Sequence, residues 1–179
     1  MKAKKQIAAA AFAVSVLTVG IASAATVSVI VDSKLNSLAA SQLTRGLDTG
    51  VTLVAGHKFS ITADPLDTWS IGTNAARHLG NADGAPSTRL YTFFGQTFNH
   101  GTLVGKIGDG LFFKVGSSLL NEIANASGTL KLFMWDRNFA DNTGDIAVDI
   151  ALVPLPGSAP LLLAGLGGVA ALRRRRKQA

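Results

Sequence analysis

Short runs in which apolar and polar residues alternate constrain the fold of this chain more than any other feature. The clearest is 145–152, where Ile146, Val148, Ile150 and Leu152 share one face and the residues between them share the other. A period of two is typical of a strand with one buried and one exposed face. Similar runs lie at 26–31, 51–55, 58–63, 89–94, 102–107, 111–115 and 129–135.

Clusters of Gly, Asn and Asp separate these runs, as in segment 80–86, and such residues favour turns. Short strands at this spacing predict an all-β fold, an antiparallel β-sandwich of jelly-roll type over residues 25–152. Only segments 35–42 and 117–126 hint at helix. Within the second, residues 121–124 are also compatible with a short turn.

Positive charge is concentrated at the two ends of the chain. The 179 residues include 17 Lys and Arg against 11 Asp and Glu, a formal net charge of +6. The segments 2–5 and 173–177 hold eight of the basic residues, and every acidic residue lies between them. The middle is therefore mildly acidic, and we expect no nucleic-acid partner. The absence of Cys excludes disulfides, thiolate metal sites and a Cys nucleophile.

The N-terminal segment 1–24 has the three parts of a secretory signal peptide. A basic start at 2–5 is followed by an apolar run at 7–21 and by small residues at 22–25. We expect recognition by Sec-type export machinery and cleavage by signal peptidase after Ala24. The alternative, an uncleaved transmembrane helix, requires a longer apolar run.

The C-terminal segment 153–179 is first uncharged and then strongly basic. The run without charge, 153–172, just suffices to cross a bilayer, so we expect a transmembrane helix at about 155–172. The basic end 173–177 would stay in the cytoplasm by the positive-inside rule. The sequence thus predicts inner-membrane anchoring with a periplasmic domain, and a plain tail anchor is the simplest alternative.

The order of parts in this tail resembles the VPLPA-CTERM sorting signal, a relative of the PEP-CTERM signals. The matching residues are Val153, Pro154, Leu155 and Pro156, a glycine-rich apolar run, and Arg173, Arg174, Arg175 and Arg176. Gly157 stands where that family usually has Ala. The resemblance implies processing by an exosortase-like membrane protease, in bacteria that make extracellular polysaccharide. We therefore expect delivery to the cell surface or the extracellular space, with such polysaccharide as a candidate partner.

The loop 135–145 before the last strand concentrates oxygen ligands. Calcium takes six to eight oxygens from carboxylates, amide groups and backbone carbonyls, which such a loop can supply. The spacing is not that of an EF-hand. Taken alone, the loop is better explained as a turn shaped by Asp and Asn side chains.

Three motifs change this interpretation, because together they resemble the calcium-dependent galactophilic lectin fold of PA-I type. They are 69–72, 101–108, and 135–144 with the alternating strand after it. The resemblance spans residues 50–150 and implies a galactose-binding-like sandwich. It also implies that calcium is bound by the side chains of Asp136, Asp141 and Asn142 and by the backbone carbonyl of Ile71. The loop is shorter than in the lectin, and Asn138 is the substitute for a missing Thr ligand.

Sugar binding is a further implication, because calcium in that lectin family coordinates two sugar hydroxyls. For the sugar-contacting His and Gln of the family, His78 is the only candidate within 75–88. Trp135 lies beside the loop and is a candidate to stack on a sugar, although a Trp is more often part of the core. His78 and Trp135 are thus the predicted carbohydrate-binding residues.

No catalytic motif accompanies these features. The sequence has no G-x-S-x-G elbow, no paired catalytic carboxylates, and three His without the spacing of a zinc site, which we interpret as surface or turn residues. We predict a non-enzymatic exported protein with a calcium-dependent carbohydrate-binding domain. The alternative is a structural surface or matrix protein with no small-molecule ligand.

Overall fold

The computed structural model describes residues 25–38, 45–86, 90–153 and Gly167. One of the chain's two compact units spans residues 23–155. The predicted signal peptide (1–24), the transmembrane helix (155–172) and the basic end lie outside the described residues, Gly167 excepted. Within the described ranges, no helix has the length and apolar character needed to span a bilayer.

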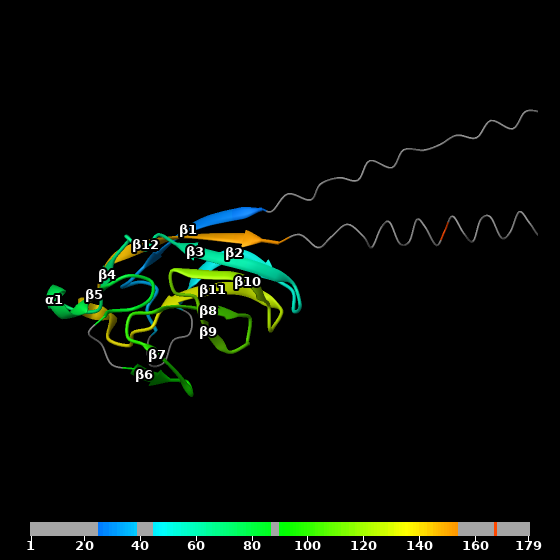
Figure 1. Ribbon diagram of the computed structural model, residues 1–179. Helices are drawn as coiled ribbons and strands as arrows, with labels where there is room; N and C mark the ends of the chain where they lie inside the picture. The colour runs from blue at the N-terminus through cyan, green and yellow to red at the C-terminus, as the bar shows by residue number, and fades with distance from the viewer. Residues whose placement is uncertain (1–24, 39–44, 87–89, 154–166, 168–179) are drawn as a thin grey trace, which may run out of the picture. The chain divides into compact units, whose positions relative to one another are not determined.

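The first sheet is organised around the long final strand β12. Its strands are β1 (Thr26–Asp32), β3 (Lys58–Ala63), β4 (Trp69–Ser70), β5 (Leu79–Gly80), β10 (Ser118–Ile123) and β12 (Thr143–Leu152). On one edge β12 pairs with β1, and on the other with β3 and, at its beginning, with β4. β10 continues the sheet beyond β3, and β5 continues it beyond β4. All of these pairings are antiparallel (Figure 1).

The second sheet has the order β2-β11-β8-β9, and a separate hairpin is formed by β6 and β7 (Figure 1). Its strands are β2 (Leu47–Leu53), β8 (Leu103–Ile107), β9 (Phe112–Lys114) and β11 (Gly128–Met134), and those of the hairpin are β6 (Leu90–Phe93) and β7 (Gln96–Asn99). The fold is therefore all-β with antiparallel sheets, as the alternating runs predict.

The main core lies between the two sheets. Ile61 and Ile150 of the first sheet belong to the same buried cluster as Leu53 and Leu132 of the second. In β12 the alternation is confirmed, because Ile146, Val148 and Ile150 are buried while the residues between them are exposed. Burial of these side chains is the main favourable contribution to folding, at about 25 cal/mol per Å² of apolar surface.

A second buried cluster covers the other face of the second sheet. It contains Leu38, Val104, Phe112, Phe133 and Trp135, with aromatic residues of the β6–β7 hairpin packed against it. The second half of β11 is consequently buried on both faces, which explains why residues 132–135 are all apolar. The hairpin is the outer layer over this face.

The helix expected within 117–126 is wrong. Residues 118–123 form β10, which pairs with β3 through an irregular register. At this irregularity Asn121 adopts a positive φ of 54°, which Asn tolerates better than most residues. The free edge of β3 offers hydrogen-bond partners to the backbone of residues 118–123, and this long-range pairing favours a strand over a helix. The local sequence pattern contains no information about it. Of segment 35–42, residues 35–38 form turns and a bridge rather than a helix, and the rest lies outside the described residues.

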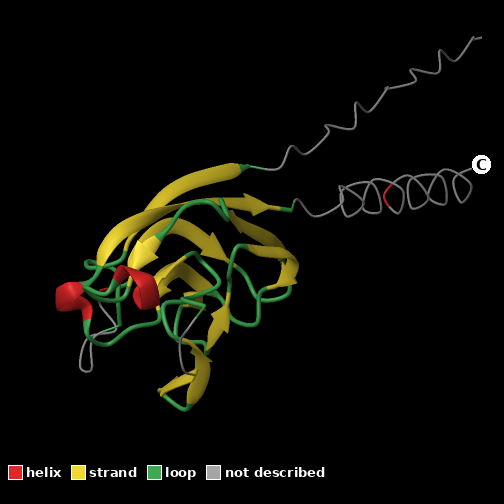
Figure 2. Cartoon of the chain, turned by 60° about the vertical axis from the view of Figure 1, so that its left-hand side comes forward, coloured by secondary structure: helices red, strands yellow, loops and turns green. Residues whose placement is uncertain are grey.

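Two short helical segments, α1 (Ala75–His78) and the 3₁₀ helix η2 (Phe139–Asp141), lie at the same end of the sheets (Figure 2). α1 connects β4 to β5, and η2 lies in the connection from β11 to β12. Because β4 pairs with the beginning of β12, this pairing draws the two connections together. They form the walls of the site described next.

Candidate functional site

A pocket of about 610 Å³ opens at this end of the domain. Its walls come from the segment after β4, from α1, from β6, from the turn after β7 and from the connection after β11. The lining residues are Ile71, Arg77, His78, Tyr91, Phe93, His100, Asp136, Arg137, Asn138 and Asp141. A larger hollow of about 820 Å³ lies over β1, β3 and β12, but no His, Arg or Asn side chain lines it.

Asp136 is the central polar residue of this pocket and is almost completely buried. The end of β11 is held to the turn after β7, since the Trp135 N–H donates to the Thr102 carbonyl at 2.8 Å. This contact brings His100 to Asp136, and the Nε2 atom of His100 donates to Oδ1 of Asp136 at 2.9 Å. The backbone N–H of Asn138 donates to the same oxygen at 3.0 Å. Among the described residues, none donates to the buried Oδ2 atom.

The electrostatic environment keeps Asp136 ionised. Burial by itself raises the pKa of this carboxyl, but the hydrogen bonds from His100 and from the Asn138 N–H outweigh it. The pKa of Asp136 therefore lies below its ordinary value of 3.8. A buried carboxylate with one satisfied and one unsatisfied oxygen is thus present at neutral pH.

Asn142 provides a second unsatisfied oxygen. Its Nδ2 atom donates to the Ser33 carbonyl at 3.1 Å and to the Ser37 hydroxyl at 3.0 Å. Because a carbonyl can only accept, these contacts fix which end of the amide is nitrogen. Within the described part of the chain, the buried Oδ1 atom of Asn142 accepts no hydrogen bond. The side chain is near enough to Asp136 to contribute to the lowered pKa of that carboxyl.

Asp141 and His78 meet at Gly72. A Cβ atom on Gly72 would lie 2.6 Å from Nδ1 of His78 and 3.1 Å from Oδ2 of Asp141, so the missing side chain leaves room for both groups. The Ile71 N–H donates to the His78 carbonyl at 3.1 Å and closes this loop. The other carboxylate oxygen of Asp141 accepts from the Asn138 side chain at 3.2 Å.

The oxygen atoms of these groups could hold a hard cation. Buried oxygens that accept no hydrogen bond cost about 1–3 kcal/mol each, and a cation would remove that cost. No cluster of three or more His, Asp or Glu side chains suited to a metal occurs among the described residues. The predicted ligand set contains only two carboxylates, Asp136 and Asp141. Its other oxygens come from amide and backbone carbonyl groups, which calcium accepts.

The structure brings most of the predicted site residues together. Ile71 and His78, from the segment after β4 and α1, line one pocket with Asp136, Asn138 and Asp141 of the connection after β11. Asn142 is buried next to Asp136, while the Asn138 side chain is engaged with Asp141.

Trp135 is located differently from the prediction of a sugar-stacking residue. Its side chain is 0% exposed, and its indole N–H donates to the Tyr91 carbonyl at 2.9 Å. The ring packs among Phe93, Phe98 and Phe112 in the second cluster. Because strand alternation turns Trp135 into the core while Asp136 turns to the pocket, its ring faces are unavailable to a ligand.

Sequence reasoning missed several pocket residues that come from other segments. The sequence pattern indicates His100 only as a surface or turn residue, and no motif includes Tyr91, Arg77 or Arg137. Tyr91 lies against His100 with ring centroids 4.1 Å apart, and this contact joins the β6–β7 hairpin to the pocket. The only sequence signal for His100 is its position directly before the motif 101–108.

Comparisons with known proteins identify similarities for the C-terminal tail and for the middle domain. Residues 152–177 match the model of the PEP-CTERM protein-sorting motif. No curated protein matches the sequence. Among solved structures, the chain is similar to "EclA N-terminal domain; PllA-like lectin", with a TM-score of 0.53 and 26% identity over 70% of this chain and 95% of that one. The chain thus carries a PEP-CTERM sorting motif at its C-terminal end, and its middle domain matches a PllA-like lectin in structure.

Proposed function

We propose that this protein is an exported surface protein whose middle domain binds carbohydrate in a calcium-dependent manner. The observation that carries the proposal is the pair of buried, unsatisfied oxygens on Asp136 and Asn142, at the pocket described above. Both atoms can only accept, so they favour a cation. The similarity to a PllA-like lectin supports the same interpretation.

The proposed calcium ligands are the side-chain oxygens of Asp136, Asp141 and Asn142 together with the Ile71 carbonyl. Calcium, when bound, supplies open coordination positions for the hydroxyl groups of a sugar. Neighbouring residues hold and orient the proposed ligands. His100 and the Asn138 N–H fix the Asp136 carboxylate, and the serines around Asn142 fix its amide. His78 and Tyr91 line the same pocket and provide polar and aromatic contacts for the sugar.

The proposed role is binding rather than catalysis. Lectin-like similarity favours this role, and none of the described pocket residues forms a nucleophile and base pair. Sec-type export, signal peptidase cleavage after Ala24 and processing by an exosortase-like protease complete the proposal. The sorting motif at residues 152–177 supports the last step.

Binding measurements on the full-length chain, purified in mild detergent, test this proposal. A glycan array probed in 1 mM calcium and again in excess chelator should show glycan binding only with calcium. Isothermal calorimetry with calcium alone should give saturable binding that Asp136→Asn abolishes. Uniform silence on the array, together with no heat of calcium binding, would favour a structural surface protein without a small-molecule ligand.

A further inference from the structure

The pocket concentrates arginine in a domain that is otherwise mildly acidic. The middle of the chain, residues 25–152, contains four arginines, and two of them, Arg77 and Arg137, line the pocket. A third, Arg45, lies over the ring of Phe139 at 3.7 Å, in the connection that forms one pocket wall. None of the described lysines lines this pocket. Positive charge is thus supplied here by the side chain that binds carboxylates in a bidentate manner.

Each of the two carboxylates in the pocket has one oxygen that accepts a hydrogen bond from within the protein. Asp136 is buried and accepts hydrogen bonds from His100 and from the Asn138 N–H. Asp141 accepts from the Asn138 side chain. These two carboxylates are also the proposed calcium ligands, so a bound cation would neutralise them further. The charge left facing a ligand is positive.

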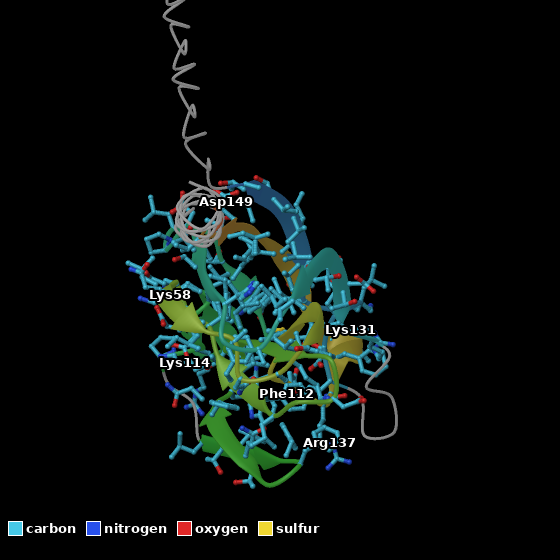
Figure 3. The ribbon with its side chains drawn as sticks, turned by 90° about the vertical axis from the view of Figure 1, so that its right-hand side faces the viewer. Lys58, Phe112, Lys114, Lys131, Arg137 and Asp149 are labelled. Atoms are coloured by element: carbon cyan, nitrogen blue, oxygen red, sulfur yellow. The ribbon has the colours of Figure 1, made fainter. Side chains whose placement is uncertain are left out.

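Arg137 is the most available of these cations. It is exposed, and its guanidinium lies over the Phe93 ring, 5.6 Å from the centroid. Among the described residues, it forms no ion pair. Stacking on an aromatic face orients the guanidinium and leaves its N–H groups free to donate in the plane. Figure 3 shows Arg137 at the surface beside the β6–β7 hairpin, away from Lys58 and Lys114.

We propose that the ligand of this pocket is an acidic saccharide, whose carboxylate is bound by Arg137 with help from Arg77. This inference rests on the proposed function and specifies its substrate class. A hexuronate fits the arrangement because it offers hydroxyl groups and a carboxylate on one ring. Its hydroxyls would face the oxygen-rich side of the pocket, where Asp136 and Asp141 lie, and its carboxylate would face the arginines.

A matched pair of ligands tests the inference on the full-length chain in mild detergent. Methyl galacturonide and methyl galactoside differ only in the carboxylate, so calorimetry in calcium isolates its contribution. We expect the uronide to bind about tenfold more tightly at low salt, since a charge-assisted bidentate contact contributes at least that factor. The preference should shrink in 0.5 M salt.

Two pocket variants and one control assign the effect to Arg137. Arg137→Ala should remove most of the preference, and Arg137→Lys should restore only part of it, because Lys cannot bind in a bidentate manner. Lys58→Ala, which removes a positive charge from β3 outside the pocket, should change nothing. Equal binding of both glycosides, unaffected by Arg137→Ala, would overturn this inference and leave the proposed function intact. Failure of both glycosides and of every arrayed glycan to bind in calcium would instead refute the proposed function.

Discussion

Exchanging Asp136 for Asn separates the stabilising effect of calcium from the stability of the fold itself. Asn has the same shape and keeps one oxygen to accept from His100 and from the Asn138 N–H. It replaces the unsatisfied Oδ2 atom with a donor and removes the buried charge. Asp136→Asn therefore leaves the architecture intact while it weakens the proposed calcium site.

The expected magnitudes follow from the contacts of Asp136. Turning the charged acceptor into a neutral one costs about 1 kcal/mol, and the new amide donor gains about as much because the unsatisfied Oδ1 atom of Asn142 beside it can accept. These terms roughly cancel, so the calcium-free melting temperature should change by less than about 4 °C. In the natural sequence, calcium at one hundred times its Kd should contribute about 2.7 kcal/mol. This corresponds to an increase of about 10 °C for a domain of this size.

Thermal unfolding of the full-length chain, followed by circular dichroism in calcium and in chelator, measures both quantities. Asp109→Asn is the matched control, because Asp109 is exposed in the turn after β8. The control should keep the full calcium-dependent increase. If Asp136→Asn keeps it as well, Asp136 is not a calcium ligand. If the natural sequence shows no increase at saturating calcium, the metal site itself is refuted.

Three further predictions concern pH, backbone conformation and sorting. Folding lowers the pKa of Asp136, so the stability that its charged form contributes should be present above about pH 4 and lost as the pH falls through the lowered pKa. Urea unfolding at pH 5 and at pH 3 should therefore show a smaller loss of stability for Asp136→Asn than for the natural sequence. Asn121→Val should lower the free energy of unfolding in urea by about 1–2 kcal/mol, because a β-branched residue is strained at a φ of 54°. Asn121→Gly should be nearly neutral. Equal effects of the two substitutions would exclude backbone strain as the cause. Deleting 173–177 should cause mis-sorting, seen by cell fractionation and immunoblotting, and unchanged processing would contradict the role of the basic end.

The strands that the sequence predicts well are those whose two faces differ. In β12 the alternation between Ile146 and Ile150 follows from one buried and one exposed face, so the local pattern is sufficient. β10 was mistaken for a helix because its structure depends on pairing with β3, some sixty residues earlier. The two-residue strands β4 and β5 depend likewise on the register of distant strands, which no local pattern contains.

The candidate site could be predicted only for residues that belong to the motifs shared with the lectin family. Asp136, Asp141 and Asn142 come from a single connection, but the loop pattern alone favours a turn, and the resemblance to a lectin is what names these three residues together with Ile71 and His78. His100 and Arg77 reach the pocket only through the pairing of strands that are distant in sequence. Trp135 and Asp136 are adjacent in sequence, yet their side chains point to opposite sides of the strand end. Trp135 was therefore predicted to contact a sugar, although its side chain is buried in the core.

The strand β12 also has a mechanical consequence for a sorted protein. It ends at Leu152, where the sorting motif begins, so tension applied to an anchored tail would act directly along this strand. β12 is flanked by β1 and β3 in antiparallel ladders, whose hydrogen bonds are perpendicular to the strand. Such a load shears many bonds together instead of opening them one at a time. A pull on the C-terminal end of β12, with the rest of the domain held, would therefore meet many of these hydrogen bonds at once.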